Sequence, residues 1–164
     1  MTHAAPASQP IDEAPNGFDE FGGPIGVGPT RTVRAAWAPT TVAASRRAIA
    51  ADLQARGVSA TIVDEAQLVI SELVTNALRH AMPLADDSVR LKWKAKGDIV
   101  EIEVSDGGSQ QSSPKPLKQQ VWAPNGRGLR IVRSVAHEWG VQETDKGTTV
   151  WACLGGPSRR RVNS

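Results

Sequence analysis

Residues 71–80, with the sequence SELVTNALRH, are the feature that most limits what this chain can fold into. At helical spacing, the polar residues of this segment form one stripe and the apolar residues form another, which predicts an amphipathic helix. Ordinary solvated helix faces favour Lys, Glu, Gln and Arg, whereas Thr75 and Asn76 each cost about 0.5 kcal/mol relative to Ala in mid-helix. The stripe is therefore either a site or a plain exposed face, and the segment alone leaves both interpretations open.

The polar stripe carries residue types that suit one kind of chemistry. Glu72 and Asn76 are four residues apart, so a carboxylate and a neutral amide lie one helical turn apart. That pair suits a cation bound through oxygen and a hydroxyl group that is polarised for attack. Arg79 is either a phosphate contact or a solvated charge. His80 is either a group near phosphates or a helix-end histidine that interacts with the helix dipole.

The chain divides into a leader, one domain and a tail. Residues 1–29 hold five prolines, four acidic residues and no Lys or Arg, and they lack periodicity, which predicts a disordered acidic leader. The whole chain has a net charge of +2 and the leader carries −4, so the remainder carries +6. Such a charge attracts phosphates or an acidic partner, but its pattern does not indicate direct binding to nucleic acid. We expect one domain over residues 30–155 and a basic flexible tail over residues 156–164.

The sequence contains neither a secretory signal nor an apolar run as long as a membrane span. Cys153 is the only cysteine and lies in an apolar, strand-like segment, which predicts a buried thiol and excludes a disulfide within the chain. The small number of Cys and His residues excludes metal clusters built from them. We therefore expect a cytoplasmic protein that has no attachment to a membrane.

The hydrophobic pattern predicts five strands and three helices in the order β-α-α-β-β-loop-α-β-β. The strands are expected over residues 31–37, 88–95, 98–105, 138–143 and 148–154, and the helices over residues 40–56, 59–81 and 129–137. Thr40 or Thr41 is expected to cap the first helix. Two hairpins and few helices favour an α+β two-layer sandwich, in which the helices cover one face of a mixed, mostly antiparallel sheet.

Residues 107–125 have no periodic pattern, although they lie inside the predicted domain. A structureless segment of this length is usually functional or disordered, and here it could close over a triphosphate as a lid. Asp106, Gly107 and Gly108 begin it: the carboxylate can accept a hydrogen bond from an exocyclic amine such as that of adenine, and the glycines let a flat ring approach. The same tripeptide is also common in hairpin turns. The Gly-Arg-Gly sequence of residues 126–128 ends the segment and either exposes helix N–H groups to phosphate or only caps the helix.

In this order and spacing, and together with SELVTNA, the motifs resemble the ATPase superfamily of gyrase, Hsp90, histidine kinases and MutL. That superfamily has the Bergerat nucleotide-binding fold. Within it, the chain looks most like the small, single-domain bacterial anti-sigma-factor serine/threonine kinases. The resemblance covers residues 31–154, nearly the whole of the predicted domain.

The resemblance implies a role for each matched residue. Glu72 polarises the attacking hydroxyl, and Asn76 ligates Mg²⁺ next to bound ATP. Asp106 binds the adenine amino group, and Gly108 gives room to the ring. A threonine of the final motif supports adenine through water, and the sequence does not say which one. The other nucleotide-binding positions implied are Arg79, His80, Gly126, Arg127, Gly128, Leu129, Thr148 and Thr149.

The resemblance implies an ATP- and Mg²⁺-dependent serine/threonine kinase that also acts as an anti-sigma factor. Its partners would be a sigma factor and an anti-sigma-factor antagonist of the STAS type, and it would form a homodimer. Gln110 departs from the D-x-G-x-G pattern of the family. An alternative is therefore a catalytically silent ATP-binding module that controls a protein partner through the conformation of its lid. A third interpretation is a detached histidine-kinase catalytic domain.

Overall fold

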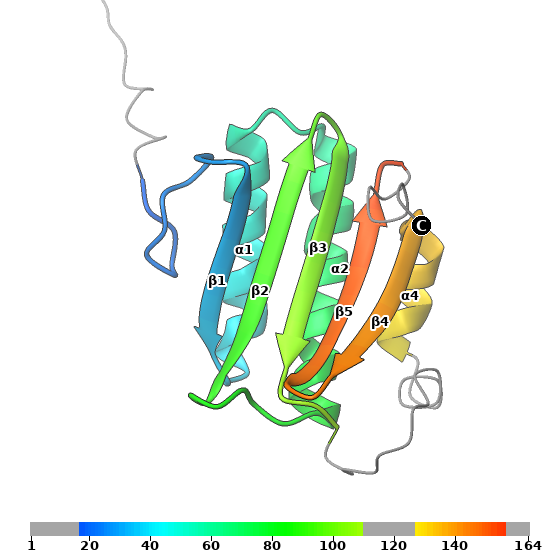
Figure 1. Ribbon diagram of the computed structural model, residues 1–164. Helices are drawn as coiled ribbons and strands as arrows, with labels where there is room; N and C mark the ends of the chain where they lie inside the picture. The colour runs from blue at the N-terminus through cyan, green and yellow to red at the C-terminus, as the bar shows by residue number, and fades with distance from the viewer. Residues whose placement is uncertain (1–16, 110–126, 157–164) are drawn as a thin grey trace, which may run out of the picture.

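The computed structural model describes residues 17–109 and 127–156. Three helices lie on one face of a five-stranded sheet in this described part, and no helix covers the other face (Figure 1). The helices are α1 (Thr40–Ala55), α2 (Ala60–His80) and α4 (Arg127–Val135), and the strands are β1 (Thr30–Ala36), β2 (Ser88–Lys96), β3 (Ile99–Asp106), β4 (Glu138–Thr144) and β5 (Gly147–Leu154). The predicted α+β two-layer fold is confirmed.

The strands follow the order β1-β2-β3-β5-β4, and every pairing among them is antiparallel, where a mixed sheet was expected. The strand β3 is central, with β2 on one side and β5 on the other. Alternate residues of β2 and β3 face the helices and are at most 1% exposed, namely Val89, Leu91, Trp93, Val100, Ile102 and Val104. The helix α2 packs over β3 and β5 and contacts α4, so that its apolar face completes the core.

The ends of the elements differ from the predicted ones by one or two residues, and the predicted cap of α1 is wrong. Pro39 occupies the N-cap position, and no side chain caps the helix. Thr41 lies inside the first turn, is buried, and donates its hydroxyl to the carbonyl oxygen of Ala36 over 2.7 Å. The hydroxyl therefore ties α1 to the end of β1 instead of satisfying the N–H groups of the helix. The helix α4 begins at Arg127, two residues before the predicted start.

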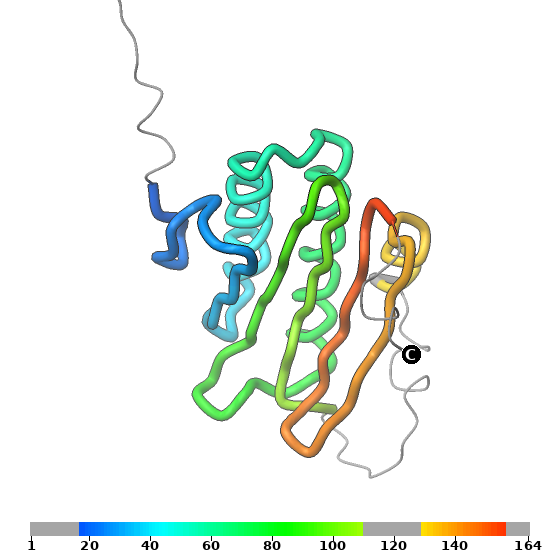
Figure 2. The backbone as a smooth tube through the Cα atoms, turned by 45° about the horizontal axis from the view of Figure 1, so that its top comes forward, coloured from blue at the N-terminus to red at the C-terminus, as the bar shows by residue number. Residues whose placement is uncertain are grey.

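The second half of the predicted leader is ordered against the domain. Residues 17–28, which we call the strap, lie beside β1 and α1 in both views (Figures 1 and 2). Within the strap, Phe18 and Pro24 form a β-bridge, and Asp19 makes an ion pair with Arg31 of β1. The prediction of disorder is thus wrong for this segment, because polar contacts and glycine turns hold it in place and leave no hydrophobic period in the sequence.

Several predictions concern residues outside the described ranges. These are the disorder of residues 1–16, the lid from Gln110 onward, Gly126 and the tail from residue 157. Among the described residues, no helix is both long enough and apolar enough to cross a membrane.

Candidate functional site

The helix α2 does not carry its polar stripe as a plain solvated face. Asn76 is only 5% exposed and follows the same helix face as Val69 and Leu73, which are fully or nearly fully buried. The Nδ2 atom of Asn76 has no hydrogen-bond partner among the described residues. Glu72 is half-buried one turn earlier, about 6 Å along the helix axis. A buried amide that lacks a partner is costly, which favours a site over an exposed face.

Two further residues of the stripe end the helix. His80 is half-buried in the last position of α2, and Arg79 is exposed. Both lie in the last turn, where a cation interacts favourably with the helix dipole. The position of Arg79 fits either a phosphate contact or a solvated charge. The position of His80 fits either a group near phosphates or a histidine that interacts with the helix dipole.

The strand β3 ends at Asp106, whose carboxylate is almost completely buried at 1% exposure. Its Oδ1 atom accepts the backbone N–H of Gly108 over 2.8 Å, whereas Oδ2 has no partner among the described residues. Burial raises the pKa of Asp106 to about 7, against a smaller lowering by the hydrogen bond from Gly108. One oxygen of this carboxylate is thus held in place, and the other is a buried acceptor with nothing to accept.

Backbone hydrogen bonds join the residues after Asp106 to the end of α2. The N–H of Gly107 donates to the carbonyl of Met82 over 2.7 Å, and the N–H of Met82 donates to the carbonyl of Gly108 over 2.9 Å. A Cβ atom at Gly107 would overlap the carbonyl oxygen of Pro83, so this approach requires glycine. The strand that follows β3 in the chain is β4, which does not neighbour it. The alternative of a hairpin turn at Asp106 is therefore excluded.

The start of β5 lies against Asp106. Thr148 is its direct partner in the strand register, is 7% exposed, and shares the helix-facing side of the strand with Val150. Thr149 is on the other face of the sheet, with its Oγ1 atom 2.7 Å from the Oγ atom of Ser105. The structure therefore separates the two candidate threonines, and only Thr148 is on the side of the Asp106 carboxylate. A Cβ atom at Gly147, where φ is +144°, would overlap the carbonyl oxygen of Asp106.

The predicted site residues thus converge from three elements on one end of the sheet, which is the lower end in Figure 1. They are the last two turns of α2, the end of β3 with Gly108, and the start of β5 with Thr148. Leu129 is 3% exposed in the hydrophobic core, so its side chain packs and only its backbone is available to a ligand. Arg127 and Gly128 are the first residues of α4, which contacts α2.

The donor set decides which groups this site suits. No cluster of three or more His, Cys, Asp or Glu side chains that could hold a metal exists among the described residues. Mg²⁺ often uses one protein ligand together with phosphate oxygens and water, and a half-turn of the Asn76 amide presents its oxygen for that purpose. The free oxygen of Asp106 suits an amine donor. The free Oδ2 atom of Asp106 and the turned Asn76 amide therefore fit an adenine nucleotide with a bound magnesium ion.

Comparison with known proteins identifies the domain. A family model described as the histidine kinase-like ATPase domain matches residues 35–154, which include α2, β3, α4 and β5. The chain belongs to this family. The match begins after the strap and spans the residues that form the site.

The fold also has a solved counterpart. The chain is similar to the crystal structure of the RsbU and RsbW domains of Rv1364c from Mycobacterium tuberculosis, with a TM-score of 0.59 and 20% sequence identity. The likeness covers 84% of this chain and 35% of that one, so this histidine kinase-like domain spans about a third of the solved chain. At this identity the likeness concerns the fold. Among curated protein sequences, none matches significantly.

One part of the site was missed by the sequence analysis. The backbone of Met82 fixes Gly107 and Gly108 next to Asp106, although no side chain of Met82 takes part. Pro83, which ends the helical pattern of α2, was the available signal that an extended segment follows. Nothing in the sequence showed that this segment pairs with residues 107–109.

Proposed function

We propose that this histidine kinase-like domain binds ATP with Mg²⁺ and transfers the γ-phosphoryl group to a serine or threonine of a protein partner. The observation that carries the proposal is the pair of buried, unpartnered polar atoms, Asp106 Oδ2 and Asn76 Nδ2, in elements that meet at one end of the sheet. Natural proteins rarely leave such atoms unpaired. The adenine amino group would pair with Asp106 Oδ2, and Mg²⁺ would bind the Asn76 oxygen once the amide is turned.

In this proposal, the adenine amino group donates to Asp106 Oδ2, and Gly108 leaves space for the ring. Thr148, next to Asp106, supports the adenine end of the site through water. The Asn76 oxygen holds Mg²⁺, which when bound would offset the negative charge that develops on the phosphoryl group. Gly126, Arg127, Gly128 and the backbone of Leu129 would bind the phosphates, and Arg79 and His80 would assist from the end of α2.

The transfer step itself requires little covalent chemistry from the protein. The oxygen of the acceptor hydroxyl forms a bond to the γ-phosphorus, and the bond from that phosphorus to the β–γ bridging oxygen breaks, so that ADP leaves. Glu72 accepts the hydroxyl proton, one helical turn from Asn76. Positioning and charge stabilisation then supply most of the rate enhancement.

The partners in this proposal follow from the resemblance to anti-sigma-factor kinases. They are a STAS-type antagonist, which supplies the hydroxyl, and a sigma factor, which a homodimer of this protein holds away from polymerase in the cytoplasm. A structural neighbour that contains an RsbW domain supports this placement at the level of the fold. The basic charge of the chain after residue 29 suits an acidic partner surface.

The test is a phosphorylation assay with labelled ATP, Mg²⁺ and candidate antagonist proteins. We expect Asn76→Ala to abolish transfer while circular dichroism shows an intact fold, and Thr149→Ala, on the opposite face of the sheet, to serve as the matched control with transfer retained. Full transfer by the Asn76→Ala variant would exclude the assigned metal role.

Two rival functions give different results in the same assay. The silent ATP-binding module, which the departure at Gln110 favours, would bind nucleotide and transfer nothing to any partner. A detached histidine-kinase domain would give a product that acid hydrolyses, because phosphohistidine is acid-labile and phosphoserine is not.

A further inference from the structure

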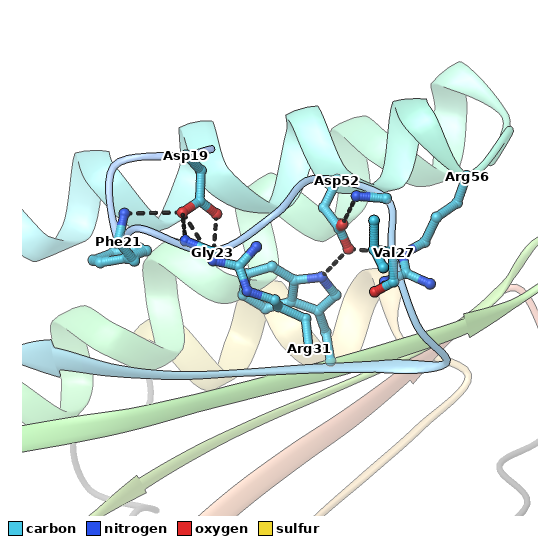
Figure 3. Close-up of polar contacts among 9 residues, drawn as sticks. Asp19, Phe21, Gly23, Val27, Arg31, Asp52 and Arg56 are labelled. Atoms are coloured by element: carbon cyan, nitrogen blue, oxygen red, sulfur yellow. Dashed lines mark hydrogen bonds and ion pairs between the residues drawn. The ribbon is translucent and has the colours of Figure 1, made fainter. Parts of the chain in front are cut away.

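The strap is held to the domain by a set of polar contacts that Figure 3 shows at close range. The Asp19 carboxylate accepts the N–H groups of Phe21 and Gly23 and makes a 2.7 Å ion pair with Arg31. Further along, the N–H of Gly26 donates to Asp52 Oδ1 in α1. The guanidinium of Arg56 donates to the carbonyl oxygens of residues 27 and 28. The Glu20 carboxylate also makes an ion pair with Arg47 of α1, and the partly buried Phe21 side chain packs against the hydrophobic core. The strap is thus bound by its backbone, by two carboxylates and by one phenylalanine.

The surface beneath the strap, which we call the groove, is formed by the domain itself. Asp52 is 0% exposed, and its Oδ2 atom accepts both the indole N–H of Trp93 over 2.7 Å and the Nε–H of Arg56 over 2.8 Å. Arg31 is 7% exposed, and its guanidinium lies 5.7 Å from the centre of the Trp93 ring. The Nη1 atom of Arg31 has no hydrogen-bond partner among the described residues. None of the contacts within the groove depends on the strap.

The strap, in contrast, is peripheral. No residue from 17 to 28 is buried as a whole, although the Asp19 side chain is. Phe18 is 67% exposed and Val27 is 58% exposed, so these two large apolar side chains contribute little to docking, whereas Phe21 is partly buried against the hydrophobic core. Segments with few buried apolar contacts open at low free-energy cost, well below global unfolding. The groove residues Asp52, Arg56 and Trp93 are thus joined to one another by hydrogen bonds that do not involve the strap, and the strap lies over them as a peripheral segment.

The groove recognises its occupant by defined chemistry. Asp52 accepts a hydrogen bond from a backbone N–H, and Arg56 donates to two backbone carbonyl oxygens. These contacts together select an extended main chain. Arg31, stacked on an aromatic ring, selects a carboxylate. Close approach selects glycine at Gly26, where φ is +73° and an added Cβ atom would lie 2.7 Å from the Cβ of Ala55. The occupant thus needs an aspartate, with a glycine seven residues after it.

We propose that the groove between β1 and α1 is a peptide-docking site for an extended segment with this aspartate–glycine pattern. In this chain the strap fills the groove in cis. When the strap is released, the groove accepts a segment of the same chemistry in trans, so the strap competes with a partner protein that carries one. This inference is independent of the nucleotide chemistry proposed for the other end of the sheet.

The test uses the full-length chain and a fluorescent peptide with the sequence of residues 17–28, GFDEFGGPIGVG. Gly26→Val should expel the cis strap, because the added side chain meets Ala55 and the backbone φ there is +73°. Val27→Thr changes an exposed neighbour and is the matched control. Hydrogen–deuterium exchange of residues 17–28 reports release of the strap, and fluorescence anisotropy reports binding of the peptide.

We expect faster exchange in the strap of Gly26→Val only, with protection of β1 and β2 retained. The peptide should bind this variant at least about tenfold more tightly than it binds the wild type or Val27→Thr, in which the groove is filled. A peptide with Asp19→Asn should bind about tenfold more weakly than the original, because it loses a charge-assisted contact.

Three results would overturn the proposal. One is an unchanged strap in Gly26→Val, and another is a released strap whose groove does not bind the peptide. The third is loss of protection across the whole sheet in Gly26→Val and also in the milder full-length variant Asp19→Asn. That result would make the strap an integral part of the fold.

Discussion

The buried carboxylate of Asp106 makes binding of the adenine base dependent on pH. Ionised Asp106 accepts a hydrogen bond from the amino group of adenine through Oδ2. Protonated Asp106 would instead present its own O–H donor to that amino group. With a pKa of about 7, Asp106 is about 90% ionised at pH 8 and about 10% ionised at pH 6. If only the ionised form binds, the dissociation constant for the base should rise about tenfold from pH 8 to pH 6.

Adenosine is the ligand of choice for this assay, because it has no phosphate group that titrates in the same range. Isothermal titration of the wild type at pH 6, 7 and 8 measures the affinity. The variant Asp106→Asn, which has no titrating group at this position, supplies the control and should show a flat profile if binding is detectable. A flat profile for the wild type would refute the assigned contact between Asp106 and adenine.

The same carboxylate also makes the stability of the ligand-free protein depend on pH. The folded-state pKa of Asp106 is above its unfolded value, so the folded protein binds more protons between about pH 4 and pH 7. The free energy of unfolding therefore falls as pH rises through this window, by up to about 4 kcal/mol from this group. Asp106→Asn should remove that loss, so urea denaturation at pH 8 should show a more stable variant than the wild type.

Three further predictions concern the residues that support the fold and the site. Trp93→Phe removes a buried indole donor from the carboxylate beneath the strap, and urea denaturation should show a loss of about 2–3 kcal/mol. By the same measurement, Gly147→Ala should lower the free energy of unfolding by more than about 2 kcal/mol. Gly97→Ala, also at positive φ but in open space, should lower it by about 1 kcal/mol. Thr148→Ala should weaken binding of adenosine several-fold and Thr149→Ala should leave it unchanged; equal effects would contradict the division between the two faces.

The parts of the fold with strong periodicity were predictable from the sequence. The helix α2 has apolar residues at helical spacing over 21 positions and ends before Pro83, so both its existence and its extent could be read. The hairpin of β2 and β3 was visible because a turn at Gly97 separates two alternating runs. In these segments the local pattern and the tertiary environment agree, which is the condition for a reliable prediction.

The sequence could not show which strands become neighbours. The insertion of β5 between β3 and β4 brings Thr148 next to Asp106 and sends Thr149 to the opposite face. Which threonine lies on which face depends on the register of a strand pairing between residues more than 40 positions apart. The candidate site residues were therefore predictable as a set, whereas the choice between the two threonines needed the structure.

The strap was missed for a different physical reason. Its docking relies on backbone groups, the carboxylates of Asp19 and Glu20, one partly buried phenylalanine and close approach of glycine, and none of these leaves a hydrophobic period. A composition rich in Pro, Gly and acidic residues is shared by disordered tails and by segments that bind as extended peptides. Only the partner surface distinguishes the two, and here that surface is built from Arg31, Arg47, Asp52 and Arg56, all outside the segment itself.

The two orphaned atoms of the candidate site also bear on why the domain keeps residues that lower its stability. A buried polar atom without a partner costs about 1–3 kcal/mol, and Asp106 adds the cost of an ionised buried carboxylate near neutral pH. Against a typical total stability of about 5–15 kcal/mol, these are large losses for positions where an apolar residue would pack well. A ligand that binds both side chains recovers part of the loss, and it binds the folded state alone. The cost of burying these polar atoms is thus itself an argument that Asp106 and Asn76 serve a ligand and not the core.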